Sequence, residues 1–190
     1  KESSAASDVY KRQVEYACEV ISEDAITLVK ALIQEAGCDG IYYCVQNAET
    51  FRFTSEEYHK FVEPYDLKVL DYANSISKYN ILHCCGWSGD KNRVEVWKNY
   101  KAAAVNLAVY VEDMDLNVGR DFFNTNCVLG GFDNRKNGVL YSGTLDEIKS
   151  ETIKLINTVG KKVQYWGRIV RCQMTVSYTH LRAHETDSYL

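Results

Sequence analysis

The residues best suited to chemistry in this chain form the short cluster His83-Cys84-Cys85-Gly86. Alternate side chains of an extended segment point to the same face, so we expect His83 and Cys85 to project together and Cys84 to face the other way. An imidazole beside a thiolate is typical of a zinc site. Cys172 is the only later cysteine at the end of an expected strand, which makes it the candidate third ligand. Three protein ligands and one open position would describe a catalytic zinc ion.

Two other interpretations of this cluster stay open. Buried histidine and cysteine side chains are common on core strands and need no ligand role. A cysteine activated as a nucleophile by the neighbouring imidazole is also possible chemistry, although the sequence shows no third group to orient the histidine.

Polar residues at the ends of other expected strands could bind a polar substrate. These candidates are Gln46, Glu49, Asn106 and Asp133. A solvated loop explains Gln46 and Glu49 equally well, and Asp133 with Asn134 could instead shape a turn or cap the next element.

His180 and His184 are spaced one helical turn apart, as in some zinc sites, but they lie in a segment with a different explanation. One DNA element, read in its two orientations, encodes both Asp8–Gln13 and Val176–Leu181. These segments also resemble translated transposase adapters used in sequencing-library preparation. We therefore interpret residues 1–13 and about 175–190 as adapter-derived tails and expect a single domain over residues 14–174.

Composition excludes several classes of function. The formal net charge is −4 and no basic stripe is present, which argues against binding to nucleic acid or to an anionic membrane. No apolar run approaches the length of a membrane span. The seven cysteines include a vicinal pair and do not form a disulfide pattern, which favours a reducing, cytoplasmic location.

The elements that must position these residues alternate between helix and strand. Helical apolar spacing covers residues 22–36, 54–77, 92–100, 114–123 and 143–160, and short β-rich apolar runs cover 40–46, 80–85, 102–110, 127–132 and 163–172. Gly37 is expected to end the first helix, and Pro64 to split the second. Thr54 with Glu57, and Thr144 with Glu147, have the spacing of capping boxes.

About five apolar strands alternating with helices predict an α/β fold with a parallel sheet covered on both faces. The chain has no G-x-G-x-x-G fingerprint, so a dinucleotide-binding fold is disfavoured. A complete (β/α)₈ barrel needs roughly 250 residues. We therefore expect a partial TIM barrel, corresponding to about the C-terminal five βα units.

Several segments, taken in order, resemble the uroporphyrinogen decarboxylase family: "GIYYCVQNAE", "FVEPYDLKVL", "NILHCCGW", "VLGGFDN" and "GVLYSGTLDEI". The resemblance implies a (β/α)₈ barrel. It is nearest to the branch of zinc-dependent methylcobalamin:thiol methyltransferases, which carries an H-x-C-G element and a later cysteine as zinc ligands. By that resemblance the ligands here are His83, Cys85 and Cys172. The implied reaction moves a methyl group from a corrinoid to a small-molecule thiol, and the implied partner is a corrinoid protein.

Two alternatives within this family remain. A true uroporphyrinogen decarboxylase removes carboxyl groups from a tetrapyrrole without metal or cofactor, but "VLGGFDN" departs from the usual G-N-L-D-P of those enzymes. A non-catalytic barrel that binds a corrinoid or tetrapyrrole would need none of the zinc ligands. For either enzyme we expect the fragment alone to be inactive.

Overall fold

The central element of the fold is a parallel sheet of four short strands. The computed structural model describes residues 2–86, 90–133 and 135–159. The strands are β1 (Tyr42–Val45), β2 (Ile81–Cys84), β3 (Ala104–Asn106) and β4 (Val128–Leu129), and each pairs in parallel with the next one along the chain. This confirms the α/β class and four of the expected strands. The fifth expected strand, at 163–172, lies outside the described residues.

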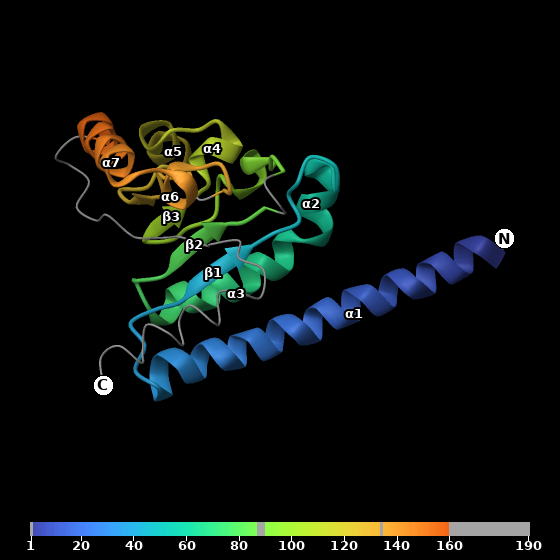
Figure 1. The fold of residues 1–190 in the computed structure, drawn as a ribbon. Helices are drawn as coiled ribbons and strands as arrows, with labels where there is room; N and C mark the ends of the chain where they lie inside the picture. Colours follow the sequence, from blue (N-terminus) through green and yellow to red (C-terminus); the bar gives the residue numbers. More distant parts are fainter. Residues whose placement is uncertain (1, 87–89, 134, 160–190) are drawn as a thin grey trace, which may run out of the picture.

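Helices connect the strands and pack beside the sheet (Figure 1). They are α1 (Glu2–Lys30), α2 (Ser55–Phe61), α3 (Glu63–Ile76), α4 (Val109–Glu112), α5 (Leu116–Phe123), α6 (Val139–Ser142) and α7 (Leu145–Val159), with a π-helical turn η1 (Ala31–Glu35) and a 3₁₀ turn η2 (Val94–Trp97). None of the described helices has both the length and the apolar character needed to cross a membrane.

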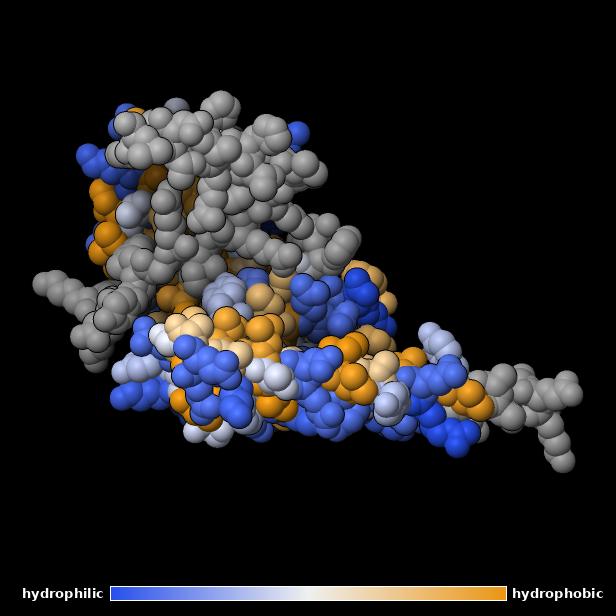
Figure 2. Space-filling view, turned by 90° about the horizontal axis from the view of Figure 1, so that it is seen from below, coloured by the Kyte–Doolittle hydropathy of each residue, from blue (hydrophilic) through white to orange (hydrophobic). Residues whose placement is uncertain are grey.

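Helix α1 is much longer than the sequence predicted. It begins at Glu2 and continues without a break past Gln13, where we expected a tail to end. Its second half packs on α3, which lies between α1 and the sheet (Figure 1). Several large side chains of α1 are exposed, Tyr16 and Ile21 among them. Figure 2 shows hydrophobic residues scattered among hydrophilic ones along this helix.

The local sequence signals act as predicted. The Thr54 hydroxyl accepts the Glu57 backbone N–H at 3.2 Å, while the Glu57 carboxylate accepts the Thr54 N–H at 2.9 Å. Pro64 occupies the first turn of α3, where its missing N–H is tolerated, so the helix is split between Phe61 and Glu63. Gly37 adopts a left-handed φ of 77°, as expected for the residue that ends a helix.

Alternation along the strands separates two different faces of the sheet. One set of strand side chains joins the main core, together with residues of α2, α3, η2 and α5: Val45, Leu82, Cys84, Val105 and Val128. These helices therefore pack on the same face. On the opposite face of β1, Tyr42 is 42% exposed and Cys44 is also exposed. Within the part of the chain that the structure describes, the expected cover on both faces of the sheet is therefore not seen at β1.

A half-buried carboxylate joins the helices to the first strand. Asp66 of α3 accepts hydrogen bonds from the hydroxyls of Tyr43, Tyr58 and Tyr100 at 3.1, 2.9 and 3.3 Å. The Trp97 indole donates in turn to the Tyr58 hydroxyl at 2.8 Å. Burial raises the pKa of Asp66 to about 6, although the tyrosine hydroxyls oppose the shift by favouring the charged form.

This raised pKa predicts a pH-dependent stability. The folded chain holds a proton on Asp66 that the unfolded chain loses near pH 4. The free energy of unfolding should therefore fall as the pH rises from about 4 to 6, by at most about 3 kcal/mol. Asp66→Asn should remove this fall, and Asp113→Asn, at an exposed site, should not. Urea unfolding at a series of pH values measures the effect. Parallel curves for the parent chain and Asp66→Asn would contradict the prediction.

Candidate functional site

Three neighbouring strands bring polar side chains together on the face opposite the main core. In the strand register, Cys44 of β1 lies beside His83 of β2, and His83 lies beside Asn106 of β3. Side chains at paired positions of a parallel sheet point to the same face. His83 and Asn106 are both buried, with His83 9% exposed. The sequence-predicted ligand His83 is therefore in contact with the sequence-predicted polar residue Asn106.

The orientation of the Asn106 amide determines which imidazole nitrogen of His83 carries the proton. Asn106 Nδ2 donates to the backbone carbonyl of Leu129 at 2.9 Å, and a carbonyl can only accept. The amide oxygen is thus directed toward His83 Nδ1 and the Tyr42 hydroxyl, with both of which it is hydrogen-bonded. Since this oxygen only accepts, Nδ1 of His83 must donate. In the neutral ring the electron pair then lies on Nε2, as metal-binding histidines often require.

Tyr42 fixes the plane of the imidazole. Its ring stacks on that of His83, with the centroids 5.1 Å apart and the planes inclined by 24°. Its hydroxyl donates to Asn106 Oδ1 at 2.6 Å, so the bond reaches from β1 over β2 to β3. No pattern in the sequence singled out Tyr42. The strand register that reveals this contact depends on tertiary pairing, so no local signal could have identified it.

Cys85 lies at the carboxyl end of β2, beside the end of β1. Its backbone N–H donates to the Val45 carbonyl at 3.1 Å. The side-chain amide of Gln46 donates to the Cys85 sulfur at 3.6 Å. A predicted substrate-binding residue is therefore in contact with a predicted zinc ligand. Cys84 joins the main core on the other face, as alternation predicted. Burial raises the pKa of the Cys84 thiol, with Glu112 and Cys85 adding to the shift.

The remaining candidate residues have structural partners. Glu49 is buried and pairs with Arg52, with Nε and Oε2 2.8 Å apart. Asp133 accepts from the Arg135 backbone N–H at 3.0 Å and from its guanidinium at 2.9 and 2.8 Å. Hydrogen bonds from Arg135 lower the pKa of the Asp133 carboxyl. Asp133 therefore shapes a loop, as the alternative interpretation expected, and substrate binding by Asp133 or Glu49 stays a prediction.

Sequence reasoning missed a buried pair beside this site. Glu112 follows β3 and is 5% exposed, and both of its oxygens accept hydrogen bonds from Asn92. Burial raises the pKa of the Glu112 carboxyl, although the bonds from Asn92 oppose the shift. A glutamate at the end of a short helix normally indicates a solvated surface, so no pattern in the sequence singled it out.

The described residues contain no cluster of three or more histidine, cysteine, aspartate or glutamate side chains placed to hold a metal ion. Cys172, His180 and His184 lie outside the described residues, so the proposed third ligand is not placed.

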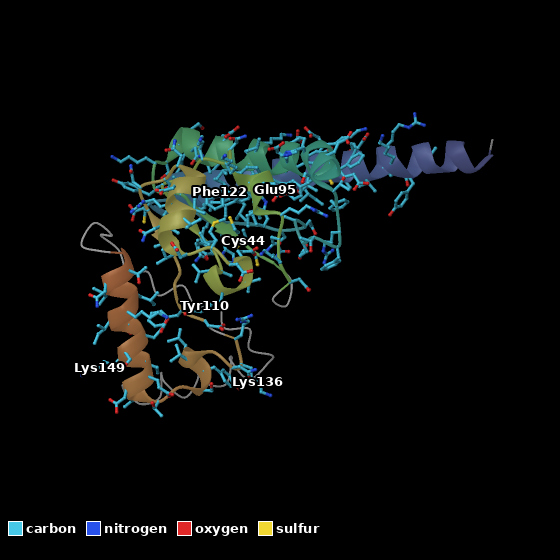
Figure 3. All side chains as sticks on the ribbon, turned by 90° about the horizontal axis from the view of Figure 1, so that it is seen from above. Cys44, Glu95, Tyr110, Phe122, Lys136 and Lys149 are labelled. Atoms are coloured by element: carbon cyan, nitrogen blue, oxygen red, sulfur yellow. The ribbon has the colours of Figure 1, made fainter. Side chains whose placement is uncertain are left out.

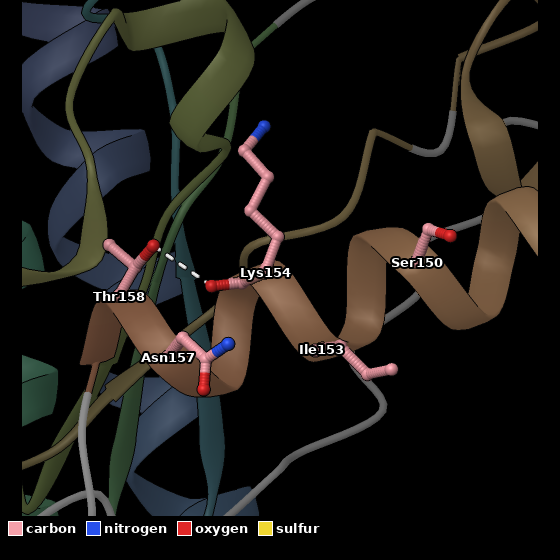
Figure 4. A pocket seen from close by; sticks show the side chains of 5 residues that line it. All are labelled: Ser150, Ile153, Lys154, Asn157 and Thr158. Carbon is pink, nitrogen blue, oxygen red and sulfur yellow. Dashed lines mark hydrogen bonds between the residues drawn. The ribbon is translucent and has the colours of Figure 1, made fainter.

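A separate hollow runs along α7 and is lined by Ser150, Ile153, Lys154, Asn157 and Thr158 (Figure 4). The Thr158 hydroxyl donates a hydrogen bond to the Lys154 carbonyl within the same helix. Tyr110, which lies between the sheet and α7 in Figure 3, donates to Glu151 at 2.7 Å. Neither feature brings together groups suited to chemistry.

The chain was compared with known protein families, curated proteins and solved structures. No protein-family model, no curated protein and no solved structure matches the chain.

The role of Asn106 as the group that orients His83 can be tested directly. Asn106→Ala leaves the Leu129 carbonyl and two donors without their partner, so we expect a loss of about 1–3 kcal/mol in the free energy of unfolding. The nitrogen NMR shifts of His83 should also change from a single Nδ1–H tautomer to a mixture. Asn157→Ala, at an exposed position of α7, is the matched control and should alter neither quantity. An unchanged His83 tautomer in Asn106→Ala would exclude the orienting role.

Proposed function

We propose that this chain is part of a uroporphyrinogen decarboxylase-family barrel that uses zinc to activate a thiol for methyl transfer from a corrinoid. The observation that carries the proposal is the Asn106–His83 hydrogen bond, anchored on the Leu129 carbonyl. It gives the buried imidazole the tautomer that a zinc ligand needs.

The sheet topology supports the barrel part of the proposal. Four parallel strands in chain order, with helices packed on one face, are what an arc of a (β/α)₈ barrel contains. In such barrels active sites lie at the carboxyl ends of the strands. Cys85 and Gln46 occupy that end of β2 and β1. The polar face of the sheet would then be the interior of the barrel.

The chemistry of the side chains fits zinc. His83 Nε2 and Cys85 Sγ would hold the ion together with Cys172, the ligand that the family resemblance supplies. When bound, zinc lowers the pKa of a substrate thiol and so provides a nucleophile at neutral pH. Asn106 keeps the proton of His83 on Nδ1, and Tyr42 limits rotation of the ring. Gln46 donates a hydrogen bond to the Cys85 sulfur and so helps to hold it in place.

Zinc binding tests the ligand assignment. The chain, equilibrated with zinc and then dialysed, should retain about one ion per molecule, and His83→Ala or Cys85→Ser should lose it. Cys44→Ser is the matched control, because Cys44 lies on the same face of the neighbouring strand and should leave the zinc content unchanged. Metal analysis that finds equal zinc in all four proteins, or none in the parent chain, would refute the assignment.

The reaction class needs a separate assay. A barrel that contains this segment should transfer methyl groups from methylcobalamin to a small thiol, and Cys85→Ser should reduce the rate by at least about 100-fold. Decarboxylation of uroporphyrinogen by the same protein, unaffected by Cys85→Ser, would instead favour the metal-free decarboxylase. Corrinoid binding without turnover would favour a non-catalytic barrel.

A further inference from the structure

We propose that Glu112 is a positioning residue for Cys85, and that it acts through Asn92 and Gly86. This inference rests on the proposed role of Cys85 as a zinc ligand and deepens it, because it names the groups that hold the loop from which the thiol projects. Glu112 lies on the segment after β3, whereas Cys85 and Asn92 lie on the segment after β2.

Glu112 accepts hydrogen bonds from Asn92 with both carboxylate oxygens. Oε2 accepts the Asn92 backbone N–H at 3.0 Å, and Oε1 accepts the side-chain Nδ2 at 2.6 Å. Both residues are almost completely buried. Among the described residues, the side-chain oxygen of Asn92 has no hydrogen-bond partner, so the amide is held through its bond to Glu112. A bond to a buried carboxylate is stronger than one between neutral groups, which makes Glu112 the main restraint on this side chain.

Asn92 in turn packs against the residue that follows Cys85. A Cβ atom added at Gly86 would overlap the Asn92 amide and would lie 3.1 Å from the Asp90 carbonyl. Gly86 is therefore in direct contact with the side chain that Glu112 holds. Since Gly86 is bonded to Cys85, fixing the backbone at Gly86 limits the directions in which the thiol can point.

The same segment is also joined to the loop that follows β1. The Thr50 N–H donates to the Lys91 carbonyl at 3.0 Å, and the Arg93 N–H donates to the Ala48 carbonyl at 2.7 Å. The loops after three consecutive strands are thus linked across the carboxyl ends of the sheet, with Glu112 supplying the link to the third. The segment that contains Asn92 is therefore held from both sides, by the loop after β1 and by Glu112 from the segment after β3.

The reactivity of Cys85 tests the inference without requiring zinc. In the chelator-treated full chain, Glu112→Ala should raise the rate of Cys85 alkylation by iodoacetamide by at least about ten-fold, because the loop opens locally. Peptide mass spectrometry separates Cys85 from Cys44, which is exposed, and from Cys84, which belongs to the core. The rates at Cys44 and Cys84 should stay within about two-fold, and Glu112→Gln, which keeps one acceptor, should restore most of the protection of Cys85.

Glu147→Ala is the matched control. Glu147 also accepts two hydrogen bonds from one residue, at 2.7 and 2.8 Å from Thr144, but it does so at the start of α7. It should leave Cys85 alkylation unchanged. Asn92→Ala is a second variant that removes the contact with Gly86, and it should also raise the rate of Cys85 alkylation. It provides the test if Glu112→Ala does not fold. An unchanged Cys85 rate in the folded variants, or a parallel rise at Cys84, would overturn the inference.

Zinc affinity separates this inference from the proposed function. If Cys85 is a ligand, Glu112→Ala should weaken zinc binding by about ten-fold or more, while Glu147→Ala should not. A parent chain that binds no zinc would contradict the proposed function, and the alkylation rates would still decide whether Glu112 positions Cys85.

Discussion

The packing of α3, η2 and α5 against one face of the parallel sheet is the contact on which the other features depend. Because strand side chains alternate, burying Val45, Leu82 and Val105 under these helices directs Cys44, His83 and Asn106 to the opposite face. A shift of one residue in the register would exchange the two sets. The hydrophobic core therefore fixes the position of the polar residues as well as the stability of the fold.

The two faces carry polar networks of different character. On the helix side, the three tyrosine hydroxyls around Asp66 satisfy a carboxylate that joins α3 to β1 and to the segments beside it. On the other side, the Asn106 amide is anchored on the Leu129 carbonyl and its oxygen accepts from Nδ1 of His83, whose ring also stacks on Tyr42. The first arrangement holds structural elements together. The second fixes the orientation of one imidazole ring.

The carboxyl ends of the strands are joined to one another by hydrogen bonds between loops. Backbone bonds connect residues 48–50 with 91–93, and the Glu112 carboxylate connects Asn92 with the segment after β3. Loops that carry reactive groups need such restraints, because an unrestrained loop would let a thiol sample many directions. Burial of Glu112 costs solvation, and its two bonds to Asn92 offset part of that cost.

The sequence by itself indicated the strands and the starts of several helices. Apolar runs identified the four described strands, the capping boxes marked the starts of α2 and α7, and Pro64 marked the break before α3, because these signals act over a few residues. Alternation also separated Cys84 from His83. The partners of those residues were decided by the tertiary structure: Tyr42 beneath His83, the Leu129 carbonyl behind Asn106, and Glu112 behind Asn92 are distant in sequence. Such contacts follow from strand register and loop packing, which no local pattern encodes.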